Sequence, residues 1–185
     1  MPPEERRAAL VEATLPLLLT HGTALTTKQV AEAAGVAEGT IFRVFPSLAE
    51  LIDATTREAL SAERLQRDIA AVKVGESLHS VTAAALGLLM RRTRSIGQLL
   101  HSLHHSPESS GTVTCLRDEL EARVAELDGW LIQQLTPHLG ELTTEPRHFV
   151  EYLRTIALGH TLAHNPTLTI DHLAQLALTG AGKAC

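Results

Sequence analysis

Residues 26–47, TTKQVAEAAGVAEGTIFRVFPS, decide the fold of this chain. A hydroxyl of Thr26 or Thr27 can cap a helix here, because it accepts hydrogen bonds from the free amides of the first turn. Ala31 is small and lets a second helix cross close to the first. Gly35 lies where the chain has to turn, and glycine adopts the left-handed conformation without steric cost. The first half of the stretch therefore predicts a short helix that ends at a turn.

The second half of the stretch predicts another short helix and then a sharp restart. Val36, Ile41 and Val44 supply apolar side chains that can anchor this helix to the first one. Pro46 ends the helix, and Ser47 with Glu50 forms a capping box for the helix that follows. Two short helices joined at a glycine turn are typical of a helix-turn-helix motif that binds DNA. The alternative is an ordinary helical hairpin without a DNA partner.

Composition indicates an all-α protein. The chain has 185 residues, of which 44% are hydrophobic and only 3% aromatic, and patterns of alternating apolar residues are nearly absent. No apolar run reaches the roughly 18–20 residues of a membrane span, and the first residues lack the apolar core of a signal peptide. The two cysteines, Cys115 and Cys185, lie far apart, which favours a reducing compartment. We expect a cytoplasmic protein that does not bind membranes.

Charge is the main argument against tight DNA binding. The net charge is −5, and the first fifty residues hold four cations against six carboxylates, a net charge of −2. The electrostatic contribution to DNA affinity is therefore expected to be modest, so that binding depends on helix N-termini, a few local cations and dimerisation. A rival hypothesis follows, in which the chain is a helical ligand-binding or interaction module with little DNA affinity.

Helical periodicity extends over most of the chain. Pro16 interrupts the first predicted helix and predicts a kink or a restart there. The predicted helices are residues 4–21, the two short helices of the hairpin, and residues 47–72, 76–92, 95–105, 113–139, 146–164 and 168–180.

With this order of elements, the chain resembles the TetR family of transcriptional regulators. The resemblance rests on a first helix that ends in His21-Gly22 and on residues 25–51, LTTKQVAEAAGVAEGTIFRVFPSLAEL. It implies about nine helices, with a helix-turn-helix DNA-binding domain at residues 1–46 and a helical ligand-binding and dimerisation domain at residues 47–185. It also implies a homodimer that binds a palindromic operator on double-stranded DNA. The resemblance further implies that the protein is a repressor and that a small-molecule effector releases it from the DNA.

The same resemblance implies which residues meet DNA. By position these are Thr26, Thr27, Lys28, Glu38, Gly39, Thr40, Phe42, Arg43 and Ser47. Two departures weaken the match: Phe42 stands where the family usually has tyrosine, and Leu48 stands where lysine is common. Glu38 places an acid in the recognition helix, where it can accept from a cytosine amino group or remain simply exposed.

The later helices carry candidate residues for an effector pocket. Large or polar side chains on them are His79, Met90, His101, Trp130, Gln134 and Tyr152. Core packing is the alternative for each of these residues. Because aromatic residues are so few, we expect a mainly aliphatic pocket and a small or flexible apolar effector.

The last two predicted helices carry the expected dimer interface, with burial inside one subunit as the alternative. The residues are Val150, Leu153, Ala157 and Leu162 on one helix and Leu173, Leu176, Ala177 and Gly180 on the other. We predict no metal and no cofactor: His101, His104 and His105 are suitably spaced, but no further metal-binding motif accompanies them. No catalytic motif is present, so the protein is not expected to be an enzyme.

Overall fold

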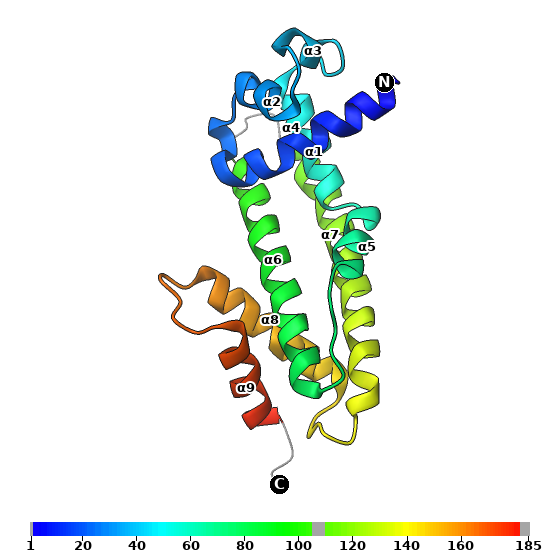
Figure 1. Ribbon diagram of the computed structural model, residues 1–185, viewed down its shortest axis with the longest axis vertical. Helices are drawn as coiled ribbons and strands as arrows, with labels where there is room; N and C mark the ends of the chain where they lie inside the picture. Colours follow the sequence, from blue (N-terminus) through cyan, green and yellow to red (C-terminus); the bar gives the residue numbers. More distant parts are fainter. Residues whose placement is uncertain (1, 105–109, 182–185) are drawn as a thin grey trace. The chain divides into compact units, whose positions relative to one another are not determined.

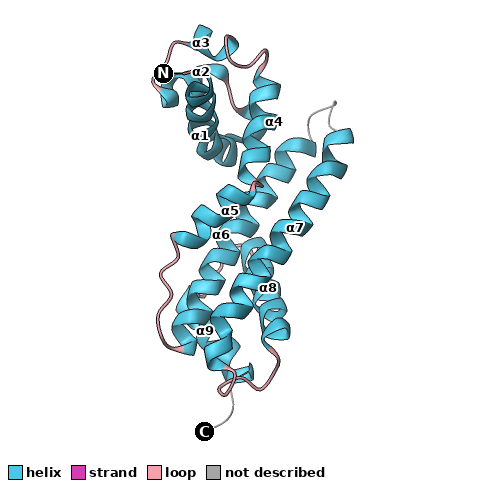
Figure 2. Ribbon diagram, turned by 90° about the vertical axis from the view of Figure 1, so that its right-hand side faces the viewer, coloured by secondary structure: helices cyan, strands magenta, loops and turns pink. Residues whose placement is uncertain are grey.

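The computed structural model describes the backbone of residues 2–104 and 110–181, and their side chains except at 23, 100–104, 110–116 and 180–181. The described part is all-helical, as predicted, with nine α-helices, two short 3₁₀ turns and no strand (Figures 1 and 2). The helices are α1 (Pro3–His21), α2 (Thr27–Ala34), α3 (Glu38–Phe42), α4 (Leu48–Ala59), α5 (Ala62–Ala70), α6 (Leu78–His104), α7 (Ser110–Leu135), α8 (Pro146–Leu162) and α9 (Ile170–Ala181). None of the helices within the described residues has the length and apolar character needed to cross a membrane.

The chain divides into two units, each with its own core. Unit 1 comprises Met1–Arg64 and Ser95–Leu120, and unit 2 comprises Leu65–Arg94 and Glu121–Cys185. The domain boundary predicted between residues 46 and 47 remains a prediction. In the structure, α4 packs against α1 and shares the core of unit 1 (Figure 1).

Unit 1 is built on α1, which packs against both α2 and α4, while α2 packs against α3. The core is aliphatic apart from one aromatic ring, Phe45, and Val30, Ile41, Phe45 and Leu51 are completely buried. α1 continues through Pro16, so the predicted restart of the helix there is wrong. These contacts hold the α2–α3 hairpin on a packed base, which is what a rigid recognition element requires.

Unit 2 has a larger apolar core, formed by α5, α8, α9 and the parts of α6 and α7 that belong to this unit. α8 packs against α9. The core contains most of the predicted dimer residues. Val150, Leu153, Ala157, Leu173 and Ala177 are at most 7% exposed and pack inside the protomer. For these five side chains the structure shows burial inside one subunit, which was the alternative, while the dimer interface itself remains a prediction.

The breaks between helices differ from the prediction at two places. The predicted helix 47–72 is broken between α4 and α5, where the Ser61 hydroxyl accepts a hydrogen bond from the Arg64 amide at 3.0 Å. The predicted helices 76–92 and 95–105 are one helix, α6, which Ser77 caps through the Ser80 amide at 3.2 Å. No glycine or proline separates residues 92 and 95, so nothing local ends the helix there.

Candidate nucleic-acid interface

The candidate interface is the α2–α3 hairpin of unit 1. α2 begins with a complete capping box: the Gln29 amide donates to the Thr26 hydroxyl at 3.3 Å, and the Thr26 amide donates to Gln29 Oε1 at 2.8 Å. The Thr26 hydroxyl also donates its hydrogen to Gln29 Oε1 at 2.9 Å. These bonds satisfy the amides of Thr26 and Gln29 and fix where the helix starts.

Gly35 makes the turn between the two helices. Its φ of 64° and ψ of 33° lie in the left-handed region. The Val36 amide reaches back to the Ala31 carbonyl at 3.0 Å, which closes the end of α2. α3 then follows as a helix of five residues, anchored by the fully buried Ile41. The predicted helix-turn-helix is therefore present, with its turn at the predicted glycine.

Gly35 and Gly39 form a matched pair for a test of this turn. Alanine at Gly35 would have to adopt a positive φ, so Gly35→Ala should cost about 1 kcal/mol of unfolding free energy. Alanine at Gly39 meets no atom within 4 Å and has helical backbone, so Gly39→Ala should stabilise the protein by up to about 1 kcal/mol. Urea unfolding followed by circular dichroism checks both values. Equal effects of the two substitutions would contradict the assignment of the turn to Gly35.

Most residues predicted to meet DNA lie at the surface of unit 1. Lys28, Glu38, Gly39 and Arg43 are exposed, and the Phe42 side chain is 52% exposed. Thr26, which was also predicted to meet DNA, is exposed as well. The other three predicted residues are half-buried, and these are Thr27, Thr40 and Ser47. Their accessibility agrees with a role in recognition, while contact with DNA stays a prediction.

Lys28 and Arg43 are the cations of the hairpin, and within the described residues neither has a carboxylate partner. Both remain available for phosphate or for base edges. A further cation of unit 1, Arg7, lies with its guanidinium carbon 4.3 Å from the centre of the Phe45 ring. The sequence shows Arg7 in the first turns of α1, but only the fold shows that it lies over Phe45.

Besides Thr26, two more residues predicted to meet DNA have a hydroxyl that is already hydrogen-bonded within the protein. The Ser47 hydroxyl accepts from the Glu50 amide at 3.2 Å and so caps α4. The Thr27 hydroxyl donates to the carboxylate of Glu38 across the hairpin. The sequence suggested the cap at Ser47 but gave no sign of the pairing between Thr27 and Glu38, which are eleven residues apart.

The six residues predicted to line an effector pocket have different surroundings. Met90 is buried in the core of unit 2, and Trp130 packs against that core. His79 and Gln134 are half-buried, whereas Tyr152 is 45% exposed. The side chain of His101 lies outside the described residues. The pocket assignment therefore remains a prediction, with core packing established for Met90.

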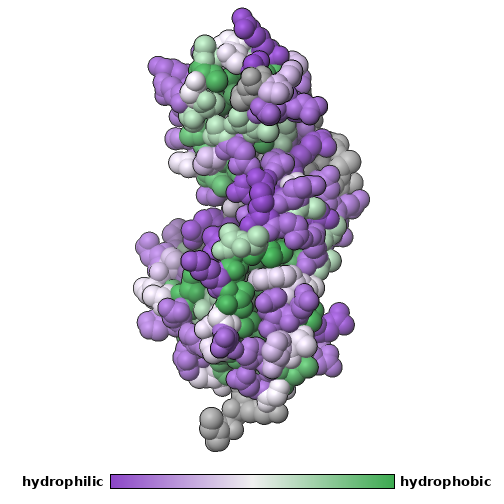
Figure 3. Space-filling view, turned by 45° about the vertical axis from the view of Figure 1, so that its right-hand side comes forward, coloured by the Kyte–Doolittle hydropathy of each residue, from purple (hydrophilic) through white to green (hydrophobic). Residues whose placement is uncertain are grey.

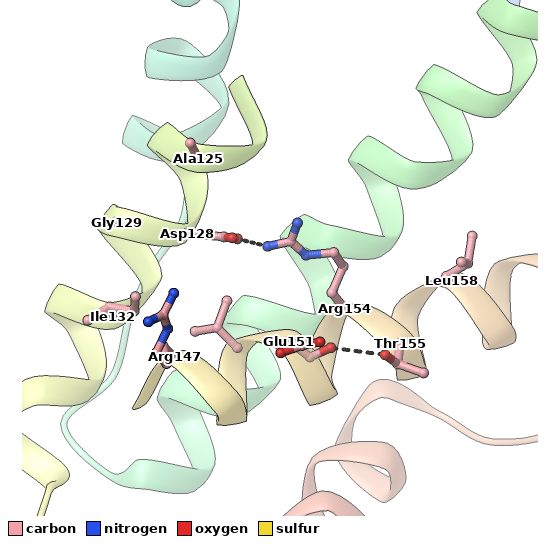
Figure 4. A pocket seen from close by; sticks show the side chains of 10 residues that line it. Ala125, Asp128, Gly129, Ile132, Arg147, Glu151, Arg154, Thr155 and Leu158 are labelled. Carbon is pink, nitrogen blue, oxygen red and sulfur yellow. Dashed lines mark hydrogen bonds and ion pairs between the residues drawn. The ribbon is translucent and has the colours of Figure 1, made fainter. Parts of the chain in front are cut away.

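A groove of about 670 Å³ lies between α7 and α8 of unit 2, and none of the six predicted pocket residues lines it. Figure 4 shows its side chains, with Asp128 of α7 paired to Arg154 of α8 across the groove. Arg147 and Glu151 line the groove from the part of α8 before Arg154, and Leu158 adds an apolar side chain after it.

Exposed apolar side chains follow the same helix and α9. Leu158 and Leu162 on α8 are 48% and 73% exposed, and Leu176 on α9 is 55% exposed. The face of the molecule in Figure 3 is mainly hydrophilic, with hydrophobic residues gathered in patches. Of the predicted dimer residues, Leu162 and Leu176 are thus exposed and available to a partner. The burial of Gly180 is not among the described features.

The described side chains contain no group of three or more His, Cys, Asp or Glu residues placed to hold a metal ion. The predicted alternative of a site at His101, His104 and His105 lies outside the described side chains.

Comparison with protein families gives one match. Residues 10–55 match the family model of bacterial regulatory proteins of the tetR family, a range that includes the whole α2–α3 hairpin. No curated protein matches this chain.

Solved structures show that the fold extends over the whole chain. The TetR transcriptional regulator SCO0520 from Streptomyces coelicolor has a TM-score of 0.64 at 18% identity, covering 97% of this chain and 99% of its own. NalD of Pseudomonas aeruginosa, described as the secondary repressor of the MexAB-OprM multidrug efflux pump, has a TM-score of 0.55 at 20% identity, covering 98% and 100%. The superantigen PfiT has a TM-score of 0.59 at 20% identity, covering 100% of both chains. At these identities the likeness establishes the fold.

Proposed function

We propose that this chain, a TetR-family protein by its helix-turn-helix domain and its fold, binds a palindromic DNA operator as a homodimer. The observation that carries the proposal is the α2–α3 hairpin, which leaves Lys28 and Arg43 exposed without a carboxylate partner in the described residues. TetR-family regulators act by binding DNA and are not enzymes, in agreement with the sequence-based expectation. In the proposed dimer, the two α3 helices read half-sites about 34–36 Å apart, which is one turn of DNA.

The proposed regulation is repression that a small-molecule effector relieves. NalD, which has the same fold, is described as a repressor, and this supports the choice of repression for this chain. The effector is proposed to be apolar and to bind in unit 2, whose core is almost entirely aliphatic. We assign the exposed leucines of α8 and α9, which are Leu158, Leu162 and Leu176, to the dimer surface, and Leu158 also lines the α7–α8 groove beside it.

Selection from a pool of random duplex DNA tests the proposal directly. Repeated binding and amplification at moderate salt should enrich a palindrome whose half-site centres are about 10 base pairs apart. Enrichment of one half-site alone would contradict the dimeric mode of binding. A pool that stays random after several rounds would contradict operator binding altogether.

Arg43→Ala should weaken binding to the enriched palindrome by about 10- to 100-fold without loss of folding, because base-edge or phosphate contacts of arginine contribute about 1–3 kcal/mol each. Thr40→Ala should weaken it less, because a hydroxyl makes a single contact. Gel-shift titration measures both, and circular dichroism verifies folding. Arg91→Ala, which removes an exposed arginine of unit 2, is the matched control and should leave affinity unchanged. Unchanged affinity in both hairpin variants would refute the assignment of the interface.

A second candidate function is a helical interaction module with little affinity for DNA. The net charge of −2 over the first fifty residues favours it, as does the missing hydroxyl at Phe42. The superantigen PfiT shares the fold, so the fold alone does not exclude a protein partner. The same selection experiment separates the two candidates, since only the regulator enriches a palindrome.

A further inference from the structure

Glu38 makes a contact that neither the hairpin nor the match to the family requires. It is the first residue of α3, and its carboxylate accepts a hydrogen bond from the hydroxyl of Thr27, the first residue of α2. Both helix starts belong to unit 1 and to the predicted DNA-binding surface. The contact therefore joins two residues that were predicted to meet DNA separately.

The contact uses a hydroxyl that DNA would also need. The Thr26 hydroxyl already donates its hydrogen to Gln29 Oε1 at 2.9 Å, which leaves Thr27 as the hydroxyl at the start of α2 that could donate to a phosphate. A hydroxyl carries one hydrogen and donates to one acceptor at a time. A carboxylate oxygen and a phosphate oxygen are both anionic acceptors, so Glu38 and DNA compete for the same hydrogen.

We propose that Glu38 is a specificity-determining residue that competes with DNA phosphate for the Thr27 hydroxyl and releases it only on the correct sequence. The inference rests on the proposed operator binding. On an operator that presents a base amino group in the major groove, such as that of cytosine, the carboxylate turns to that donor and Thr27 becomes free to bind phosphate. On other sequences nothing replaces the lost hydrogen bond, and the negative charge of Glu38 repels the backbone.

The geometry favours this role over that of a structural brace. Glu38 is exposed, and the hairpin is already fixed by the Thr26 capping box, by the Gly35 turn and by the buried Ile41. A surface hydrogen bond of this kind adds about 1 kcal/mol or less to stability. The contact is thus of small value to the fold, while it controls a donor at the predicted interface.

Glu38→Gln tests the proposal because it removes the charge and keeps the size of the side chain. Binding to a scrambled duplex should become at least about fivefold tighter, since one repulsive charge near phosphate is lost. Binding to the palindrome enriched by selection should improve less or weaken, so that the ratio of the two affinities falls. Glu32→Gln, which removes an exposed charge of α2, should change both affinities equally and is the matched control.

A double-mutant cycle tests the competition itself. In the wild-type background, Thr27→Val should hardly change binding to the scrambled duplex, because Glu38 already holds the hydroxyl. In the Glu38→Ala background, the same change should weaken binding severalfold, because the hydroxyl is then free to reach phosphate. Equal effects of Thr27→Val in both backgrounds would overturn the proposal. So would a Glu38→Ala variant that melts lower and binds both duplexes more weakly by the same factor, which is the behaviour of a brace.

The outcomes also separate this inference from the proposed function. If the wild-type protein binds no duplex, operator binding and the role of Glu38 both fall. If it binds the enriched palindrome and Glu38→Gln leaves the ratio of affinities unchanged, only the role of Glu38 falls.

Discussion

Replacing Leu162 and Leu176 together by glutamate is expected to convert the proposed dimer to a monomer. The two leucines are 73% and 55% exposed on α8 and α9, which pack against each other. Full burial of a leucine contributes about 1.5–3 kcal/mol, and two-fold symmetry counts each residue twice. Glutamate removes this contribution and places like charges on both sides of the contact. Sedimentation at micromolar concentration measures the change in mass.

Loss of the dimer should lower affinity for a palindrome by at least about 100-fold, because the second half-site then binds from solution and not at an effective millimolar concentration. Half-site affinity should be unchanged, since the hairpin belongs to unit 1 and both substitutions lie in unit 2. Titration of full-site and half-site duplexes with the same variant separates the two effects.

Leu139→Glu provides the matched control for this experiment. Leu139 is 53% exposed and follows α7, so it is an exposed leucine of unit 2 outside α8 and α9. The control should remain dimeric and keep the affinity of the wild-type protein. A monomeric wild type, or a doubly substituted protein that still sediments as a dimer, would contradict the assigned surface.

The hairpin was predictable because its determinants are local. Thr26 and Gln29 form the capping box within one turn, and Gly35 supplies the positive φ at the end of the same helix. Interactions that span three or four residues can be read from the order of the chain alone. The same reasoning applies to Ser61, whose local cap starts α5 inside the predicted helix 47–72, where periodicity alone had been used.

The exposed face of α8 proposed for the dimer could not be separated from the buried face by sequence, because α8 is apolar on more than one side. Val150, Leu153 and Ala157 keep helical spacing, and so do Leu158 and Leu162. Periodicity shows that both sets form stripes but not which stripe the protomer covers. The fold decides this, since the first set lies in the core of unit 2 and the second remains exposed. Composition offered no signal for the difference, because both stripes are aliphatic.

The contact between Thr27 and Glu38 is a non-local feature of the same kind. Each residue by itself is a polar side chain at the start of a helix, which sequence reasoning could assign to DNA, or to a helix cap for Thr27 and to solvent for Glu38. Their pairing depends on how α3 crosses α2, which the Gly35 turn and the buried Ile41 determine together. The shape of the hairpin can therefore be predicted from local sequence, whereas the hydrogen bonds between its two helices cannot.

The second large effect concerns the apolar core of unit 1, against which the α2–α3 hairpin packs. Phe45→Ala is expected to lower the free energy of unfolding by about 3–5 kcal/mol, the usual cost of removing a fully buried phenylalanine. Phe45 is 0% exposed in the core of unit 1, and the Arg7 guanidinium carbon lies 4.3 Å from its ring centre. The substitution therefore leaves a cavity and also removes the aromatic face beneath Arg7. Since a domain is stable by only about 5–15 kcal/mol, unit 1 should lose most of its stability and DNA binding should be lost with it.

Phe42→Ala is the matched control, because Phe42 is 52% exposed and only three residues away. Its loss should change stability by less than about 0.5 kcal/mol, although it can change DNA affinity. Urea unfolding followed by circular dichroism gives both free energies. Fluorescence of Trp130, the single tryptophan, reports on the unfolding of unit 2. In Phe45→Ala the fluorescence transition should differ from the circular dichroism transition more than in the wild type, because unit 1 unfolds at lower urea. Equal losses for the two phenylalanines would contradict the placement of Phe45 in the core, because only a buried ring leaves a cavity when it is removed.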